Sequence, residues 1–239
     1  MLDIHLVPVL KDNYVYILVD QATGDAAVLD PGEGTPVIEA LEDRGIEPKY
    51  ILNTHHHWDH TNGNPKLAKR YGAEIVAPKG ENRIKGVTHE VWDGDTFTLG
   101  GSKAQIISTP GHTTHSICFY FAEDKALFCG DTLFSIGCGR LFEGTAEMMF
   151  DSFQKLKALL DEVKVYCGHE YTEANVKWAQ NLLNDNEDLE KYAHEVSKQR
   201  SYGLPSIPSM MGVEKKANPF MLATSAKEFQ KFRDHKDKF

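Results

Sequence analysis

Short apolar runs alternate with turns rich in Gly and Asp along the first two-thirds of the chain, which is typical of a mixed α/β domain. The apolar residues 14–19 and 26–29 flank Thr23-Gly24-Asp25, which predicts a hairpin. Segments that end at Gly45 and Gly72 predict helices over residues 35–44 and 66–71. Further short strands are predicted at residues 1–6, 50–53, 74–77, 105–108, 117–121, 126–129 and 164–167.

Helical spacing replaces this pattern after Gly168. It predicts helices over residues 172–183, 187–200 and 225–236, with a Pro-containing connector over residues 201–219. We therefore expect a mixed α/β domain over residues 1–170 and a small helical domain over residues 171–239.

The net charge and the lengths of the apolar runs limit which kinds of molecule the chain can bind. The chain has 239 residues and a formal net charge of -9, which argues against a duplex nucleic acid because phosphate binding needs a basic face. A small anionic ligand held by a local basic cluster remains compatible with this charge. No apolar run approaches the roughly 18 residues of a membrane span, and the first residues lack the features of a signal peptide. The 4 Cys show no Cys-x-x-Cys pair, so we expect buried thiols and a cytoplasmic location.

Histidines cluster in the middle of the chain. Seven of the 11 His lie between His55 and His115, and the densest segment is Thr54-His55-His56-His57-Trp58-Asp59-His60, directly after the predicted strand 50–53. In extended backbone His55, His57 and Asp59 share a face, and a bend can bring His60 beside them. Four nitrogen and oxygen ligands within six residues predict a site for zinc, iron or manganese. We expect His56, which points away, to support the site rather than to bind metal.

Three further candidates follow predicted strands at turns that contain Gly. They are His112, Asp131 and His169. One catalytic zinc takes about three protein ligands and a water, so seven candidates predict two ions. A natural division places His55, His57 and His112 on one ion and Asp59, His60 and His169 on the other, with Asp131 bridging. Such a pair of ions holds a hydroxide at neutral pH, which is typical of a hydrolase.

The motif His-x-His-x-Asp-His over residues 55–60, with the three downstream ligands in this order, resembles the metallo-β-lactamase superfamily. The resemblance implies an αββα sandwich with the metals at one edge of its two sheets, followed here by the small C-terminal helical domain. Members of the superfamily act on β-lactams, thioesters, lactones and nucleic acids, and some are oxygenases, so the superfamily alone leaves the substrate open.

Four other segments narrow the resemblance. Residues 137–145, 166–172, 218–220 and 233–239 resemble the hydroxyacylglutathione hydrolase (glyoxalase II) family, from end to end of the chain. The resemblance implies that the glutathione moiety contacts Arg140, Phe142, Tyr171, Arg233 and Lys236. Arg140 replaces a Lys and keeps its charge, whereas Phe142 replaces a Tyr and lacks its hydroxyl. Arg and Lys suit the two carboxylates of glutathione.

The resemblance implies a metal-dependent thioester hydrolase of methylglyoxal detoxification. The metal-bridged hydroxide would cleave S-D-lactoylglutathione to D-lactate and glutathione, with Asp59 and Asp131 as ligands at the reacting centre. We expect two divalent ions per chain, zinc before iron or manganese. We also expect a monomer that binds this small thioester and neither nucleic acid nor a membrane.

Three alternatives remain. A glutathione persulfide dioxygenase would hold one iron with His55, His112 and Asp131, and the complete second ligand set weighs against it. The chain could instead be a β-lactamase, but the segments that resemble the hydroxyacylglutathione hydrolase family would then have arisen by coincidence. A non-catalytic metal-binding module would have lost ligands or open coordination, yet all seven candidates are present.

Overall fold

The computed structural model describes all residues from 1 to 239 and divides the chain into two compact units. The first unit comprises Met1–Ser108 and His115–Gly130, and the second comprises Thr109–Thr114 and Asp131–Phe239. The domain boundary expected at residue 170 lies inside the second unit, and it stays a prediction.

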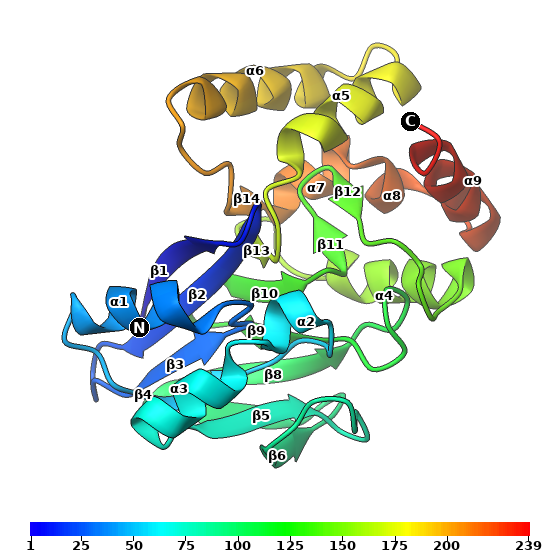
Figure 1. Cartoon of the computed structure of the whole chain (residues 1–239). Helices are drawn as coiled ribbons and strands as arrows, with labels where there is room; N and C mark the ends of the chain where they lie inside the picture. The colour runs from blue at the N-terminus through cyan, green and yellow to red at the C-terminus, as the bar shows by residue number, and fades with distance from the viewer. The chain divides into compact units, whose positions relative to one another are not determined.

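A six-stranded sheet forms the larger layer of the first unit. Its strands follow chain order: β1 (Leu2–Val9), β2 (Asn13–Asp20), β3 (Ala26–Leu29), β4 (Pro48–Leu52), β5 (Glu74–Pro78) and β6 (Val87–Val91). The first three strands pair antiparallel and the rest parallel. The parallel crossovers contain α1 (Gly34–Glu42) and α3 (Asn64–Tyr71), and Figure 1 shows both helices alongside this sheet. Val37, Leu41 and Leu67 of these helices pack against its apolar face.

A second sheet completes the first unit. Its antiparallel strands are β7 (Thr96–Leu99), β8 (Ser102–Ser108), β9 (Ile117–Phe121) and β10 (Ala126–Gly130). Tyr16 of β2 meets Phe128 of β10 edge to face at 5.4 Å, and Tyr50 meets Phe97 at 5.2 Å. Because these pairs join the two sheets, the first unit is a β-sandwich with helices on its outer face.

The second unit is mainly helical. Its elements are β11 (Leu133–Phe134), β12 (Gly137–Cys138), α4 (Ala146–Lys157), β13 (Lys164–Cys167), α5 (Thr172–Leu182), α6 (Glu187–Ser201), β14 (Ser209–Met210), α7 (Met211–Ala217), α8 (Pro219–Leu222) and α9 (Ala226–Lys236). Aromatic rings fill its core, where Trp178 stacks on Phe220 at 5.2 Å and Phe229 meets Phe153 at 5.1 Å. The core therefore ties α4, α5, α8 and α9 together.

Most predicted elements are confirmed, including the three helices now seen as α5, α6 and α9. The predicted connector over residues 201–219 is wrong in part, because it contains β14 and α7. The hydrophobic pattern did not predict β6, β7 or the β11–β12 hairpin. All four Cys are buried free thiols, as expected. None of the helices combines the length and apolar character needed to cross a bilayer.

Candidate metal centre and substrate pocket

The His-rich segment of the first unit begins at the carboxyl end of β4 and turns into α2 (Trp58–Thr61). His55 Nε2 lies 3.1 Å from His57 Nδ1, and His60 Nε2 lies 3.7 Å from Asp59 Oδ2. The segment therefore presents two pairs of ligand atoms, and each pair matches one of the two ligand sets that the sequence predicts.

Asp30, directly after β3, orients His60. One oxygen of Asp30 lies 3.1 Å from His60 Nδ1, and the other accepts a hydrogen bond from the Thr54 amide at 2.8 Å. A carboxylate on Nδ1 leaves the Nε2 lone pair for a metal and raises the basicity of the ring. Asp30, His55 and His60 also offer ligand atoms within 4.8 Å of one another. Because both oxygens of Asp30 already have hydrogen-bond partners, we infer that Asp30 supports the ligand His60 rather than binds metal itself.

Asn13 orients the neighbouring ligand. Its side-chain amide donates to both the backbone carbonyl and the carboxylate of Asp59, each at 3.1 Å. Asn13 is buried at the start of β2, so the β1–β2 hairpin supports the ligand segment. Neither Asn13 nor Asp30 is among the site residues predicted from the sequence. The sequence pattern could have indicated Asp30, because it follows an apolar strand and lies next to a turn that contains Gly. The predicted ligand Asp131 has the same two features.

His56 has a partner outside the ligand pairs. Its Nδ1 lies 3.3 Å from Glu81 Oε2, and His115 Nδ1 lies 3.7 Å from the same oxygen. Glu81 also accepts a hydrogen bond from Arg83 Nε at 2.7 Å. These contacts agree with the expectation that His56 supports the site rather than binds metal, and His115 contacts the same carboxylate.

The second unit brings the other three predicted ligands together. Asp131 Oδ2 lies 3.4 Å from His112 Nε2 and 3.3 Å from His169 Nε2, and all three residues are buried. One carboxylate oxygen is thus close to an imidazole nitrogen of each predicted ligand set, and the bridging role of Asp131 stays a prediction. His112 Nδ1 lies 2.8 Å from the Arg140 carbonyl, and the His169 ring stacks on Tyr171 at 4.7 Å. Both imidazoles are therefore fixed in orientation.

Gly139 makes this close arrangement possible. A Cβ at this position would lie 1.9 Å from the Asp131 carbonyl oxygen and 3.0 Å from His112 Nδ1. Any larger residue would have to displace the ligand segment, so the packing against Asp131 and His112 requires Gly at position 139.

A cavity of about 690 Å³ opens beside these ligands within the second unit. His112 and Asp131 line it, and so do all five residues expected to contact glutathione: Arg140, Phe142, Tyr171, Arg233 and Lys236. Asn175 and Lys177 of α5 also line it, and neither is among the residues predicted from the sequence. The size suits a small molecule, and the cations suit an anionic one.

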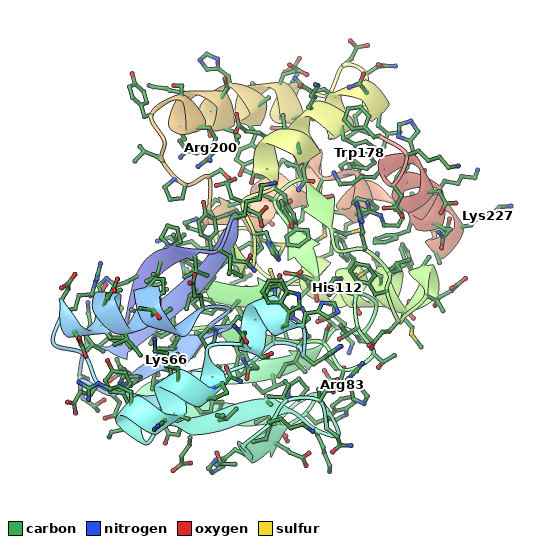
Figure 2. All side chains as sticks on the ribbon, viewed as in Figure 1. Lys66, Arg83, His112, Trp178, Arg200 and Lys227 are labelled. Atoms are coloured by element: carbon green, nitrogen blue, oxygen red, sulfur yellow. The ribbon has the colours of Figure 1, made fainter.

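The two cations of α9 that line the pocket, Arg233 and Lys236, have different surroundings. Arg233 is 4 % exposed, and its guanidinium donates to the Cys138 carbonyl at 2.8 Å and to Asp237 Oδ1 at 2.8 and 3.1 Å. Lys236 Nζ lies 4.8 Å from the ring centre of Trp178, and Figure 2 shows Trp178 on α5 facing α9. Burial, with the nearby charge of Arg233, lowers the pKa of Lys236 to about 8. An anion beside Lys236 would therefore stabilise its charged form and offset the electrostatic cost of burial.

Cys138 also lines the pocket. Burial raises the pKa of its thiol to about 11 despite the neighbouring Arg233. Because the thiolate is the nucleophilic form, Cys138 is an inert wall at neutral pH.

Two family models together match almost the whole chain. Residues 10–169 match the metallo-beta-lactamase superfamily, and residues 170–239 match the hydroxyacylglutathione hydrolase C-terminus. The chain is 48% identical to the hydroxyacylglutathione hydrolase of Rhodospirillum rubrum over 230 residues, 96% of this chain and 90% of the relative. It is 44% identical to that of Pelagibacter ubique over 239 residues, 100% of both. The chain belongs to the hydroxyacylglutathione hydrolase family.

Solved structures agree on the fold. The crystal structure of ETHE1 from Myxococcus xanthus matches with a TM-score of 0.74 and 24% identity, over 98% of this chain and 90% of that one. The expected fold class, a metallo-β-lactamase sandwich followed by a C-terminal helical region, is confirmed.

The ligand groups fit divalent metal. They contain imidazole nitrogens and carboxylate oxygens, without thiolates, and their ligand atoms face one another at 3.1 to 3.7 Å within each unit. Hydrogen bonds to the far nitrogens of His60 and His112 are the supports that metal-bound imidazoles normally have.

Proposed function

We propose that this chain hydrolyses S-2-hydroxyacylglutathione thioesters, with S-D-lactoylglutathione giving D-lactate and glutathione. The observation that carries the proposal is the 690 Å³ pocket, which has candidate metal ligands on its wall together with Arg140 and Lys236. The match of residues 170–239 to the hydroxyacylglutathione hydrolase C-terminus supports the same substrate class. The reaction is the step of methylglyoxal detoxification that releases the hydroxy acid.

The metal content is part of the proposal. His55, His57 and His112 are assigned to one divalent ion, and Asp59, His60 and His169 to the other, with Asp131 bridging. Zinc is the preferred metal, and iron and manganese are the alternatives with the same ligand chemistry. When bound, the ions supply a nucleophile at neutral pH and offset the negative charge that develops on the thioester oxygen.

The chain's own residues hold and orient the substrate. Arg140 is 69% exposed at its side chain and is placed to bind a carboxylate. Lys236 offers a second, partly desolvated cation. Phe142 and Tyr171 contribute ring faces, and the Tyr171 ring also covers His169. Arg233 holds the Cys138 carbonyl, and its contact with glutathione stays a prediction.

The leaving group makes a separate acid unnecessary. The departing thiol has a pKa of about 8.5, so it leaves as a thiolate without a dedicated proton donor. Asp59 and Asp131 would serve as metal ligands at the reacting centre. The Phe134 ring meets the Tyr171 ring at 5.2 Å and the His169 ring at 5.8 Å, so the two aromatic rings pack around His169 at this side of the pocket.

The organisation and location remain proposals from the sequence. Residues 1–170 would form the catalytic domain and residues 171–239 the substrate-binding domain. The chain would act as a cytoplasmic monomer. Sedimentation of the metal-loaded protein would test the monomer.

Turnover of S-D-lactoylglutathione by metal-analysed protein tests the function. We expect thioester loss that requires metal, and no oxygen uptake on glutathione persulfide. Asp131→Ala should abolish turnover and lower the metal content. Oxygen uptake without thioester hydrolysis would support the one-iron dioxygenase, and metal binding without either reaction would support the non-catalytic module. Retained activity of Asp131→Ala with one metal would contradict the dinuclear site.

A further inference from the structure

The β11–β12 hairpin has a turn that its own sequence does not favour. Phe134 pairs with Gly137, so Ser135 and Ile136 form a two-residue connection. Ile136 is buried and has φ 56, in the left-handed region that β-branched side chains rarely adopt. Two-residue hairpin turns normally place Gly, Asn or Asp at such positions. Interactions from outside the hairpin must therefore hold this conformation.

Three buried side chains supply those interactions. Glu214 of α7 accepts a hydrogen bond from the Ile136 amide at 2.9 Å. Asn218, which follows α7, donates to the Gly137 carbonyl at 3.0 Å and to Glu214 at 2.9 Å. Asn175 of α5 donates to the Ser135 carbonyl at 2.8 Å. We call Asn175, Glu214 and Asn218 the hairpin clamp, and Figure 1 shows the hairpin beside α7 and the start of α5.

The fit between the clamp and the hairpin is close. Glu214 and Asn218 have no exposed surface, and Asn175 is 2% exposed. A Cβ at Gly137 would lie 2.6 Å from Asn175 Nδ2, so the hairpin strand carries Gly where the clamp approaches it. Burial raises the pKa of Glu214. A buried carboxyl of this kind is costly, and the hydrogen bonds that it accepts from the Ile136 amide and the Asn218 side chain offset part of this cost.

The β11–β12 hairpin connects the candidate metal ligand Asp131 to the pocket-wall residues Gly139 and Arg140. Asp131 lies two residues before β11, and Gly139 and Arg140 follow β12 directly. The Gly139 amide donates to the Thr132 carbonyl at 3.2 Å, which ties the two ends of the hairpin together. Phe134 and Cys138 of the hairpin line the pocket. Any change in the turn would therefore move the Asp131 carboxylate and the pocket wall together.

We propose that the hairpin clamp positions Asp131 and the Gly139–Arg140 pocket wall, so that the C-terminal helices set the geometry of the metal ligand as well as bind substrate. This inference rests on the proposed thioester hydrolysis. The three clamp residues act through the hairpin and are positioning residues. The expected signature is a joint loss of metal retention and of kcat, beyond what lower stability explains.

Asn218→Ala tests the clamp, and Asn186→Ala is its matched control. Each Asn caps a helix in the same unit, Asn218 for α8 and Asn186 for α6. Each also donates its amide to a carbonyl, but Asn186 donates to Lys216 and does not touch the hairpin. At a temperature well below both Tm values, Asn218→Ala should lose about 10-fold or more in kcat and in metal retained against a chelator. Asn186→Ala should keep both near the wild-type values.

A second pair of variants covers the case in which Asn218→Ala does not fold. Glu214→Gln keeps the size and an acceptor for the Ile136 amide, so it should retain kcat and metal. Glu214→Met keeps the length without the acceptor and should lose both by about 10-fold or more. If Asn218→Ala or Glu214→Met folds and keeps the wild-type kcat and metal retention, the proposed clamp is wrong. Lack of turnover in the wild-type protein would instead contradict the proposed function, and metal retention would still test the clamp.

Discussion

Lys236 should make glutathione binding depend on pH in a range where an ordinary lysine would not. Burial, followed by the charge of Arg233, lowers its pKa to about 8. The charged form binds a carboxylate, so binding is favoured below this pKa and is lost as the pH rises through it. With a pKa near 8, roughly 90% of Lys236 is protonated at pH 7 and roughly 10% at pH 9. The expected loss of affinity over these two pH units is therefore about 10-fold.

Inhibition of thioester hydrolysis by S-hexylglutathione measures this dependence, because the inhibition constant reports binding without turnover. Lys236→Arg is the control, since an Arg stays charged over the whole range. Titration of the ligand's own amine affects both proteins equally, so the difference between the two profiles isolates Lys236. Equal profiles for the wild-type protein and Lys236→Arg would refute the reasoning. They would show that Lys236 keeps its charge to higher pH or does not contact the ligand.

Three other substitutions test separate parts of the site. Asp30→Ala removes the carboxylate on His60 and should lower metal affinity about 10- to 100-fold; unchanged metal retention after dialysis against a chelator would contradict this. Phe142→Tyr adds a hydroxyl at the pocket and should lower KM about 3- to 10-fold if it gains one hydrogen bond to glutathione; an unchanged KM would mean that the ring alone contributes. Gly139→Ala should remove most activity and metal through its overlap with Asp131, whereas Gly101→Ala, whose nearest atoms lie at 3.7 and 3.8 Å, should match the wild type in both assays.

The hydrophobic pattern predicted the elements that bury a continuous or periodic apolar face. β9 and β10 are fully buried runs, and α5, α6 and α9 carry clear helical spacing. The pattern failed for β6, whose central three residues are exposed and polar because it is an edge strand. It failed for α7 because seven residues are too few to show a helical period above background.

The candidate ligands were predictable because their residue types are rare together and each follows a strand end. The residues that orient them were not predictable in the same way. Asn13 lies 46 residues before the metal-ligand candidate Asp59 that it orients, and Asn218 donates to a carbonyl 81 residues away. No local spacing in the sequence therefore connects either Asn with its partner. The β11–β12 hairpin had no turn signal in the sequence, because the local preference of Ile136 opposes the left-handed backbone that it adopts there.

The acidic composition and the basic pocket act over different distances. The net charge of -9 would repel a glutathione anion if it acted as a whole, but at physiological ionic strength exposed charges are screened beyond about 8 Å. Arg140 and Lys236 line the same cavity and would meet the ligand at contact distance, where screening is weak. Burial strengthens this effect for Lys236, because its lowered pKa means that the charge there lacks the stabilisation that water would give. The selectivity for a small dicarboxylate therefore depends on the few charges in the pocket, and changes of exposed acidic residues elsewhere should leave the affinity for glutathione ligands nearly unchanged.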